Sequence, residues 1–221
     1  MRTRLALVLV AIAAASVAAP ADPAGPVSLP KAKTRGAVSV ETALSQRRSL
    51  RNPTAKPLLL AEVGQLCWAA QGVTDEKGHR TAPSARAAYP LEVYVLAGDV
   101  RDLPAGVYRY LPPSHALEPV SAGDRRAEFV RRGVGQGWVE KAPVIFVLTG
   151  TLSKMSGMGD RGPQFMAIEA GLAAQGFFLQ AEALGLGSTF VGGFRPAEAR
   201  EALELPEGEE VLGVLPVGHH P

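Results

Sequence analysis

The chain has 221 residues, 47% of them hydrophobic and 20% charged, which suits one domain with a sizeable core or two small ones. Its 23 basic and 21 acidic residues give a formal net charge of +2. Such a balance offers no argument for nucleic acid or an anionic membrane as a partner. Cys67 is the only cysteine, so an intramolecular disulfide is excluded.

Residues 1–19 have the features of a secretory signal peptide. Arg2 and Arg4 precede an apolar run from Leu5 to Ala19, and a Pro/Ala segment follows. The run is shorter than the roughly 20 residues that span a bilayer, which argues against the alternative of an uncleaved membrane anchor. We expect a periplasmic or secreted protein with no membrane span after cleavage. Cleavage removes Arg2 and Arg4, which leaves 21 basic residues against 21 acidic ones.

Residues 20–36 are rich in Pro, Ala and Lys without a period, which predicts a linker or an arm that lies over a neighbour. The folded domain is expected over residues 37–221. It begins with a helix that Ser39 caps, with apolar positions at Val40, Ala43 and Leu44.

The cluster Arg47-Arg48-Ser49-Leu50-Arg51 follows this helix and is a candidate anion site. Arginine stays charged at any working pH, and its planar fork of donors suits a phosphate monoester. The alternative is a solvated basic turn, because short clusters of this kind are common on protein surfaces.

A second helix is predicted from the apolar positions Val63, Leu66, Cys67 and Ala70, with Gly72 as a left-handed C-cap. Cys67 lies in this apolar pattern, which favours a small buried side chain. The competing interpretation, a catalytic thiol, lacks a histidine at a suitable spacing. Polar residues 73–80 predict a loop.

Strands are predicted where apolar residues alternate or run continuously. The expected strands are 91–97, 107–110, 116–120, 143–149 and 211–217. The second and third are separated by the turn Pro112-Pro113-Ser114 and form a hairpin or meander. The continuous apolar run at 143–149 predicts a central strand that is covered on both faces.

Three further helices are expected. Residues 125–132 predict a polar, exposed helix, and residues 196–203 a short helix that Pro196 opens. The longest, 164–184, is rich in small residues that allow close helix packing; its positions Ile168, Leu172, Gln175 and Leu179 have helical spacing, and Gly185 and Gly187 end it. Because helices and strands mix without a βαβ rhythm, the predicted class is α+β.

Two kinds of site are disfavoured. The glycine-rich stretches at 133–137 and 185–187 neither follow a strand nor open a helix, as a dinucleotide-binding motif requires, so we interpret them as loop and cap glycines. The four histidines lack metal-ligand spacing, so no metal site is expected.

Three other stretches form a possible site together, although each alone is compatible with an ordinary turn. The arginine cluster supplies phosphate contacts, and Pro83-Ser84-Ala85-Arg86 supplies a tight loop before a strand. The segment Phe190-Val191-Gly192-Gly193-Phe194 supplies backbone without side chains beside aromatic residues. Since no Cβ blocks them, the Gly192 and Gly193 amides can approach the edge of a flat redox ring.

Five sequence blocks in the same order resemble the nitroreductase superfamily, and more narrowly its SagB-type, thiazole/oxazole dehydrogenase-like branch. They are Arg-Arg-Ser-x-Arg, Leu-Cys-Trp-Ala-Ala-Gln-Gly, Arg-Thr-Ala-Pro-Ser-Ala-x(4)-Pro-Leu-Glu-Val-Tyr-Val, Gly-Val-Tyr-Arg-Tyr and Glu-Ala-Gly-Leu-Ala-Ala-Gln-Gly. The resemblance runs from about Leu29 to Pro221. It implies a three-layer fold with a central, mostly antiparallel sheet, and an FMN-binding homodimer with flavin sites at the subunit interface.

The resemblance also implies roles for particular residues. Arg47, Arg48, Ser49 and Arg51 match the phosphate and ribityl contacts; Pro83, Ser84 and Ala85 match the loop beside the flavin; Gly192 and Gly193 match the segment facing the N5 edge of the ring. His219 stands near the place of a C-terminal basic residue that contacts the phosphate in many members. Some members have Glu at the position of Gly192, so this chain lacks that acid, and it also lacks the Lys/Tyr pair of heterocycle-forming dehydrogenases. No catalytic residue is assigned.

The function implied is FMN-dependent oxidoreduction by ping-pong hydride transfer through the flavin N5 to or from a small organic substrate such as a nitroaromatic or a quinone. The donor is NAD(P)H or, since NAD(P)H is scarce outside the cytoplasm, another reductant. Arg86 and Arg161 are candidates for stabilising charge or orienting the substrate. Two alternatives remain: a non-catalytic flavin-binding or carrier protein on the same fold, and a purely structural exported protein.

Overall fold

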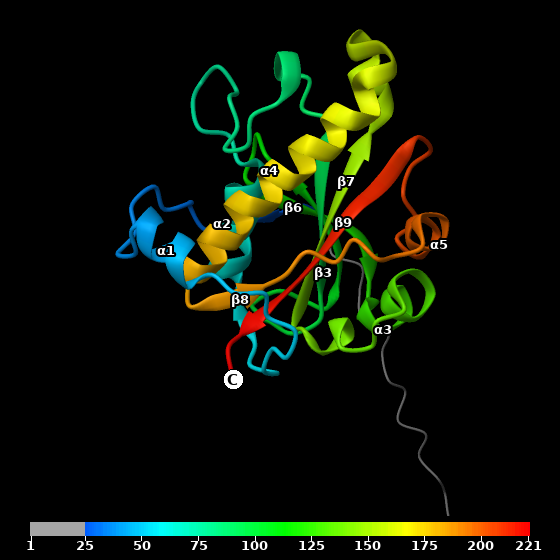
Figure 1. Ribbon diagram of the computed structural model, residues 1–221. Helices are drawn as coiled ribbons and strands as arrows, with labels where there is room; N and C mark the ends of the chain where they lie inside the picture. The colour runs from blue at the N-terminus through cyan, green and yellow to red at the C-terminus, as the bar shows by residue number, and fades with distance from the viewer. Residues whose placement is uncertain (1–24) are drawn as a thin grey trace, which may run out of the picture.

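The computed structural model describes residues 25–221, so the predicted signal peptide and the start of the predicted arm lie outside the described residues (Figure 1). Its main sheet has seven strands in the order β1-β6-β5-β3-β7-β9-β8, and every neighbouring pair is antiparallel. These strands are β1 (Val27–Ser28), β3 (Leu91–Ala97), β5 (Gly106–Leu111), β6 (Ala116–Ala122), β7 (Val144–Thr151), β8 (Leu186–Ser188) and β9 (Glu209–His219). A separate parallel pair joins β2 (Leu58–Leu59) to β4 (Val100–Arg101).

Five α-helices cover the two faces of the sheet. They are α1 (Val40–Gln46), α2 (Leu60–Gln71), α3 (Arg126–Phe129), α4 (Gly162–Ala183) and α5 (Pro196–Ala202). Figure 1 shows α1, α2 and α4 grouped together, while α3 and α5 lie at the opposite side of the sheet. The predicted α+β class and the three-layer arrangement around a mostly antiparallel sheet are therefore confirmed.

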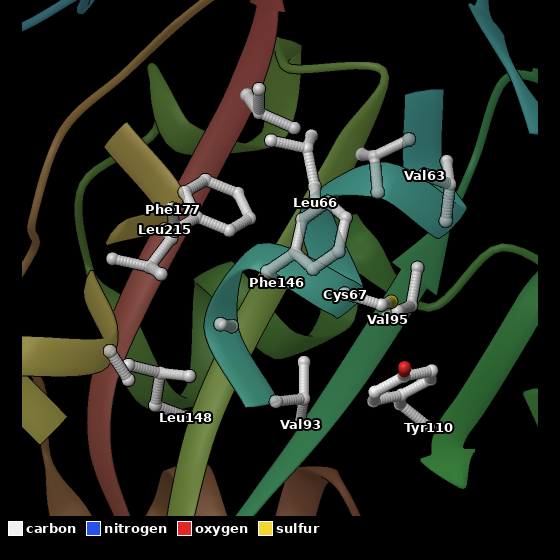
Figure 2. Packing of buried hydrophobic residues seen from close by; sticks show 14 of the residues in the cluster. Val63, Leu66, Cys67, Val93, Val95, Tyr110, Phe146, Leu148, Phe177 and Leu215 are labelled. Carbon is white, nitrogen blue, oxygen red and sulfur yellow. The ribbon is translucent and has the colours of Figure 1, made fainter. Parts of the chain in front are cut away.

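Strand β7 shows why the sheet needs covering on both sides. Its residues alternate between two hydrophobic clusters: Phe146 faces α2 and α4, while Ile145 and Val147 face the cluster around α3 and α5. Figure 2 shows Phe146 close to Leu66 and Phe177, and the rings of Phe146 and Phe177 meet edge to face with centroids 4.8 Å apart. The prediction of a central strand buried on both faces is confirmed.

The beginning of the described chain belongs to this sheet. β1 pairs with β6 of the predicted hairpin, which is confirmed as β5 and β6. His115 holds the same segment, since its ring lies 2.9 Å from the Tyr110 hydroxyl and 3.0 Å from the Pro30 carbonyl oxygen. Part of the segment predicted as a linker or arm over a neighbour is thus an edge strand of its own chain, and the packed structure begins before residue 37.

The predicted left-handed C-cap at Gly72 is wrong. Gly72 has φ −67° and ψ 146°, which any residue adopts, and its N–H donates to the Trp68 carbonyl 2.7 Å away. A Cβ at Gly72 would overlap the Trp68 indole. Glycine is therefore required at this helix end because the Trp68 side chain occupies the space of a Cβ, and not because the backbone is left-handed.

The predicted exposed helix over 125–132 is only partly correct. α3 ends at Phe129 and continues as a π-helix over Val130–Val134, in which Gly135 (φ 73°) is the left-handed C-cap. Phe129 and Val130 are buried against the second face of the sheet. The surrounding arginines obscured this apolar contact in the sequence pattern.

The apolar positions predicted for the longest helix lie on the wrong face. In α4, Ile168 is 49% exposed and Leu172 45% exposed. The buried face is built of smaller or unexpected residues, namely Met166, Glu169, Ala170, Ala173, Ala174, Phe177 and Ala181. As expected for a helix rich in small residues, α4 approaches α2 closely, since a Cβ on Gly176 would lie 3.0 Å from the Ala69 carbonyl oxygen. Packing against α2 and the sheet thus buried the face that carries the alanines, Met166 and Phe177, and left Ile168 and Leu172 exposed.

Helix α1 likewise exposes some of its predicted apolar positions. Ser39 caps α1 as predicted, and its hydroxyl accepts from the Thr42 N–H at 3.1 Å. Of the three predicted apolar positions only Ala43 is buried, while Val40 and Leu44 are 62% and 54% exposed. Over residues 25–221, no helix combines the length and apolarity that crossing a bilayer requires.

Candidate functional site

The arginine cluster lies at the end of the sheet where β8 and β9 meet. Arg47 is the C-cap of α1, and its N–H donates to the Ala43 carbonyl. The chain then runs beside β8: Ser49 forms a parallel bridge with Ser188, and the Leu50 N–H donates to the Ser188 carbonyl at 3.1 Å. A Cβ on Gly187 would lie 2.7 Å from the Leu50 side chain, so the cluster is seated directly on the strand.

The cluster carries positive charge without a compensating acid. Within residues 25–221 no carboxylate forms an ion pair with Arg47, Arg48 or Arg51. One nitrogen of Arg48 donates to the Ser45 and Arg47 carbonyls, at 3.0 and 2.9 Å, which fixes that guanidinium beside the helix end. Three uncompensated guanidiniums on a fixed backbone can bind an anion such as a phosphate.

His219 lies at the same end of the sheet. Its backbone pairs with Leu186 on β8, and its carbonyl accepts from the Thr54 N–H at 3.0 Å, just beyond the cluster. Among the described side chains, its Nε2 is the buried polar atom without a hydrogen-bond partner. Buried nitrogen atoms are normally satisfied, so this atom lacks a partner that a water molecule or a ligand would supply.

Gly192 and Gly193 follow β8 and lie exposed over β9. Val191 anchors them, because it exchanges two backbone hydrogen bonds with Val214 at 2.9 and 3.1 Å. Neither glycine has a positive φ, and a Cβ on either would meet only an ordinary contact at 3.5 Å. Since neither conformation nor packing demands glycine here, the bare backbone is best explained by close approach of another molecule.

Phe190 was not predicted as a site residue by itself, but it borders this backbone. It is 41% exposed, and its ring packs directly on Gly213 of β9, where a Cβ would collide with it. An exposed aromatic ring fixed beside bare glycine backbone provides a flat apolar wall.

The loop Pro83-Ser84-Ala85 is not beside the arginine cluster. The Ala85 N–H donates to Glu169 in the first half of α4, whereas the cluster lies beside β8, which follows the other end of that helix. From Glu169 to Ala183 the helix alone covers about 20 Å at 1.5 Å per residue. Figure 1 shows α4 lying across the molecule between this loop and the segment that follows β8. A single chain therefore brings Arg47, Arg48, Ser49, Arg51 and His219 together at one end of the sheet, and the segment after β8 leads from there to Gly192 and Gly193. The loop Pro83-Ser84-Ala85 lies away from this group.

Two arginines with predicted substrate roles lie near that loop. Arg86 donates to the Gly157 carbonyl at 3.2 Å, and the Arg161 guanidinium stacks 4.6 Å from the centre of the Phe165 ring. Both belong to the end of the molecule around the 3₁₀ segment Leu152–Arg161 and the start of α4.

Glu169 is a residue that the sequence prediction missed. A lone acid within the apolar part of this helix, at the start of the block Glu-Ala-Gly-Leu-Ala-Ala-Gln-Gly, was the available signal, and only the structure shows that it lies on the buried face. The left-handed glycines at 135 and 185 cap helices, but Gly133 lies inside the π-helix and Gly187 inside β8, so the interpretation of both stretches as loop and cap glycines is only partly correct. Across residues 25–221, no group of three or more potential metal ligands occurs.

Cys67 is fully buried in the core, between α2 and the sheet (Figure 2). Desolvation raises the pKa of its thiol far above the usual range, which suppresses the reactive thiolate. We therefore expect the folded protein not to react with a thiol-specific chromogenic reagent at pH 8, while the denatured protein should react with one equivalent. Rapid labelling of the folded protein would contradict this burial.

Comparison with known proteins identifies the family. The family described as Nitroreductase matches residues 44–219. "Putative nitroreductase MJ1384" of Methanocaldococcus jannaschii is 37% identical over 182 residues, which cover 82% of this chain and 91% of that protein. A solved nitroreductase-type structure from Ralstonia eutropha is 32% identical, covers 89% of this chain and 90% of that chain, and has a TM-score of 0.79.

A more distant structure shares the fold alone. A chain of the microcin synthetase complex McbBCD of Escherichia coli is 24% identical, covers 87% of this chain and 76% of that chain, and has a TM-score of 0.68. The predicted nitroreductase-like architecture is confirmed by these similarities. The chain therefore belongs to the nitroreductase family of flavin-dependent oxidoreductases.

Proposed function

We propose that the protein is an exported, homodimeric FMN oxidoreductase that transfers a hydride to or from a small organic substrate. The observation that carries this proposal is the uncompensated cluster of Arg47, Arg48 and Arg51, seated on β8 and followed along the chain by the bare backbone of Gly192 and Gly193. The cluster suits the terminal phosphate of FMN, and the glycines suit the edge of its ring.

The residues present fit FMN on three counts. No carboxylate within residues 25–221 forms an ion pair with the guanidiniums of Arg47, Arg48 and Arg51, so a bound phosphate would supply the negative charge that balances them. The buried Nε2 of His219 needs a partner at the same end of the sheet. Neither the backbone conformation nor the packing at positions 192 and 193 requires a glycine.

Each part of the chain then has a defined task. Arg47, Arg48, Ser49 and Arg51 bind the phosphate and ribityl end, and His219 adds a contact there. The Gly192 and Gly193 amides would face the reactive edge of the ring, and Phe190 would close one side. When bound, FMN supplies hydride transfer at its N5 atom, from a reduced donor and then to an oxidant, which is ping-pong exchange. No side chain is needed as a dedicated acid or base.

The proposed dimer explains two features that one chain leaves unexplained. Ile168 and Leu172 on α4, together with Val40 and Leu44 on α1, expose large apolar side chains that water would otherwise contact. The loop Pro83-Ser84-Ala85 lies across α4 from its own arginine cluster, so it reaches a flavin site only if the partner subunit holds that flavin. We therefore assign the α4 face to the dimer interface.

The family and the sequence support a proposal for the donor and the substrate. NAD(P)H or another reductant donates, and a nitroaromatic, a quinone or a similar small molecule accepts. Arg86 and Arg161, close to the Pro83-Ser84-Ala85 loop, would orient an anionic group of either. The order of sequence blocks and the fold shared with the McbBCD chain support membership of the SagB-type branch.

The test is the purified mature protein. We expect it to be yellow, to retain stoichiometric FMN, and to oxidise NAD(P)H in the presence of a nitroaromatic or a quinone. A yellow protein that dithionite bleaches but that turns over no donor and acceptor pair would favour the alternative, a flavin carrier. A colourless protein without affinity for FMN would contradict both.

A further inference from the structure

Glu169 is a buried carboxylate with a single, specific partner. It lies on the inner face of α4, is 4% exposed, and forms no ion pair within residues 25–221. Its Oε1 accepts from the Ala85 N–H at 2.8 Å. Glutamate is rarely buried unless it is paired, because burial of a carboxylate is costly. An apolar residue would suit this helix better, so the loop at Ala85 must account for the acid.

That loop has an unfavourable backbone conformation. Arg86, Ala87 and Tyr89 have φ values of 53°, 53° and 44°, in the left-handed region that residues other than glycine seldom adopt. Three such residues within four positions persist only where their surroundings hold them. Strained backbone of this kind occurs preferentially at functional sites.

The contacts that hold the loop differ in exposure and in whether the partner lies inside or outside the loop. Ser84 accepts twice from within the loop, its carbonyl from the Ala87 N–H at 3.0 Å and its hydroxyl from the Tyr89 N–H at 2.8 Å. The side chain of Arg86 reaches Gly157, but this contact is exposed. Glu169 supplies a partly buried contact from outside the loop, and its side chain is buried on a helix of 22 residues packed against the core.

We propose that Glu169 is a positioning residue for the flavin site. Its carboxylate fixes the Ala85 amide and thereby sets Pro83 and Ser84 in the conformation that meets the flavin ring. Glu169 itself touches neither flavin nor substrate. This inference rests on the proposed function, because it takes the Pro83-Ser84-Ala85 loop as a wall of the FMN site.

Two substitutions separate the hydrogen bond from the bulk of the side chain. Glu169→Gln keeps an acceptor oxygen for the Ala85 N–H, whereas Glu169→Leu keeps the volume and removes the acceptor. Glu182→Leu removes a carboxylate from the far end of the same helix and is the matched control. Glu169→Leu should still fold, because leucine suits a buried helix face and this gain offsets part of the cost of leaving the Ala85 N–H without its acceptor.

The first measurement needs no flavin. Hydrogen exchange of the peptide covering residues 82–90 in the apoprotein should become at least about tenfold faster in Glu169→Leu, because a charge-assisted hydrogen bond is lost. Glu169→Gln and Glu182→Leu should exchange like the wild type. The second measurement is FMN affinity, where we expect Kd to rise about tenfold in Glu169→Leu and to stay within about threefold of wild type in Glu169→Gln.

The outcomes are distinguishable. Faster exchange together with weaker FMN binding in Glu169→Leu, both restored in Glu169→Gln, supports the inference. Unchanged exchange overturns it, as does faster exchange with wild-type FMN affinity. If the wild type itself binds no FMN, the proposed function fails first and the assignment of Glu169 to a flavin site fails with it, while the exchange data still report whether Glu169 holds the loop.

Discussion

Replacing Arg48 and Arg51 together with alanine is expected to abolish stoichiometric FMN binding. Each charge-assisted hydrogen bond to the phosphate contributes roughly 1.5–3 kcal/mol, so the loss of one at each residue raises Kd by at least about 100-fold. The fold should persist, because both side chains are exposed and neither forms an ion pair within residues 25–221. Flavin titration measures the affinity, and circular dichroism of the apoprotein checks the fold.

The matched control removes two other exposed arginines. Arg101→Ala combined with Arg131→Ala changes the net charge equally, and the Arg101 and Arg131 side chains form no ion pair or side-chain hydrogen bond within the described chain. This variant should bind FMN like the wild type at moderate salt. Wild-type affinity in the Arg48/Arg51 variant would refute the phosphate assignment, and equal losses in both variants would reduce it to a non-specific charge effect.

Leu172→Glu is expected to convert the proposed dimer to monomers and to release FMN in parallel. Leu172 is 45% exposed on α4, so the substitution is tolerated in an isolated chain. In the dimer it would place an unpaired charge in an apolar interface, at a cost of several kcal/mol, which raises the dimer dissociation constant by at least about 100-fold. Light scattering after size-exclusion chromatography gives the mass, and absorbance at the same elution volume gives the flavin content.

Val120→Glu is the control for this prediction. Val120 is 40% exposed on β6, away from α4, so the same kind of change should leave both mass and flavin content unaltered. A dimeric Leu172→Glu variant would show that α4 is not the interface. A monomer that retains FMN would show instead that one chain completes the site, and that the Pro83-Ser84-Ala85 loop has another task.

Local sequence patterns predicted most of the secondary structure. Alternation and apolar runs located β3, β5, β6, β7 and β9, because these strands contact the core on one or both faces. Helix periodicity located α4 but chose the wrong face. An amphipathic pattern marks the face that avoids water, and it does not say whether the chain's own core or a second molecule covers that face.

The sequence by itself determined the class of the fold and the chemistry that the chain offers at each position: guanidiniums at residues 47, 48 and 51, bare backbone at 192 and 193, and a tight loop at 83–85. Only the tertiary structure decided which of these meet. β8 and β9 bring the arginine cluster and His219 to one end of the sheet, because backbone pairing joins residues more than 130 positions apart. The same packing places the Pro83-Ser84-Ala85 loop across α4 and brings Glu169 beneath it. Contacts such as the one between Glu169 and Ala85 depend on how a helix lies on a sheet. That placement depends on the volumes of side chains that are distant in sequence, so no local sequence pattern predicts it.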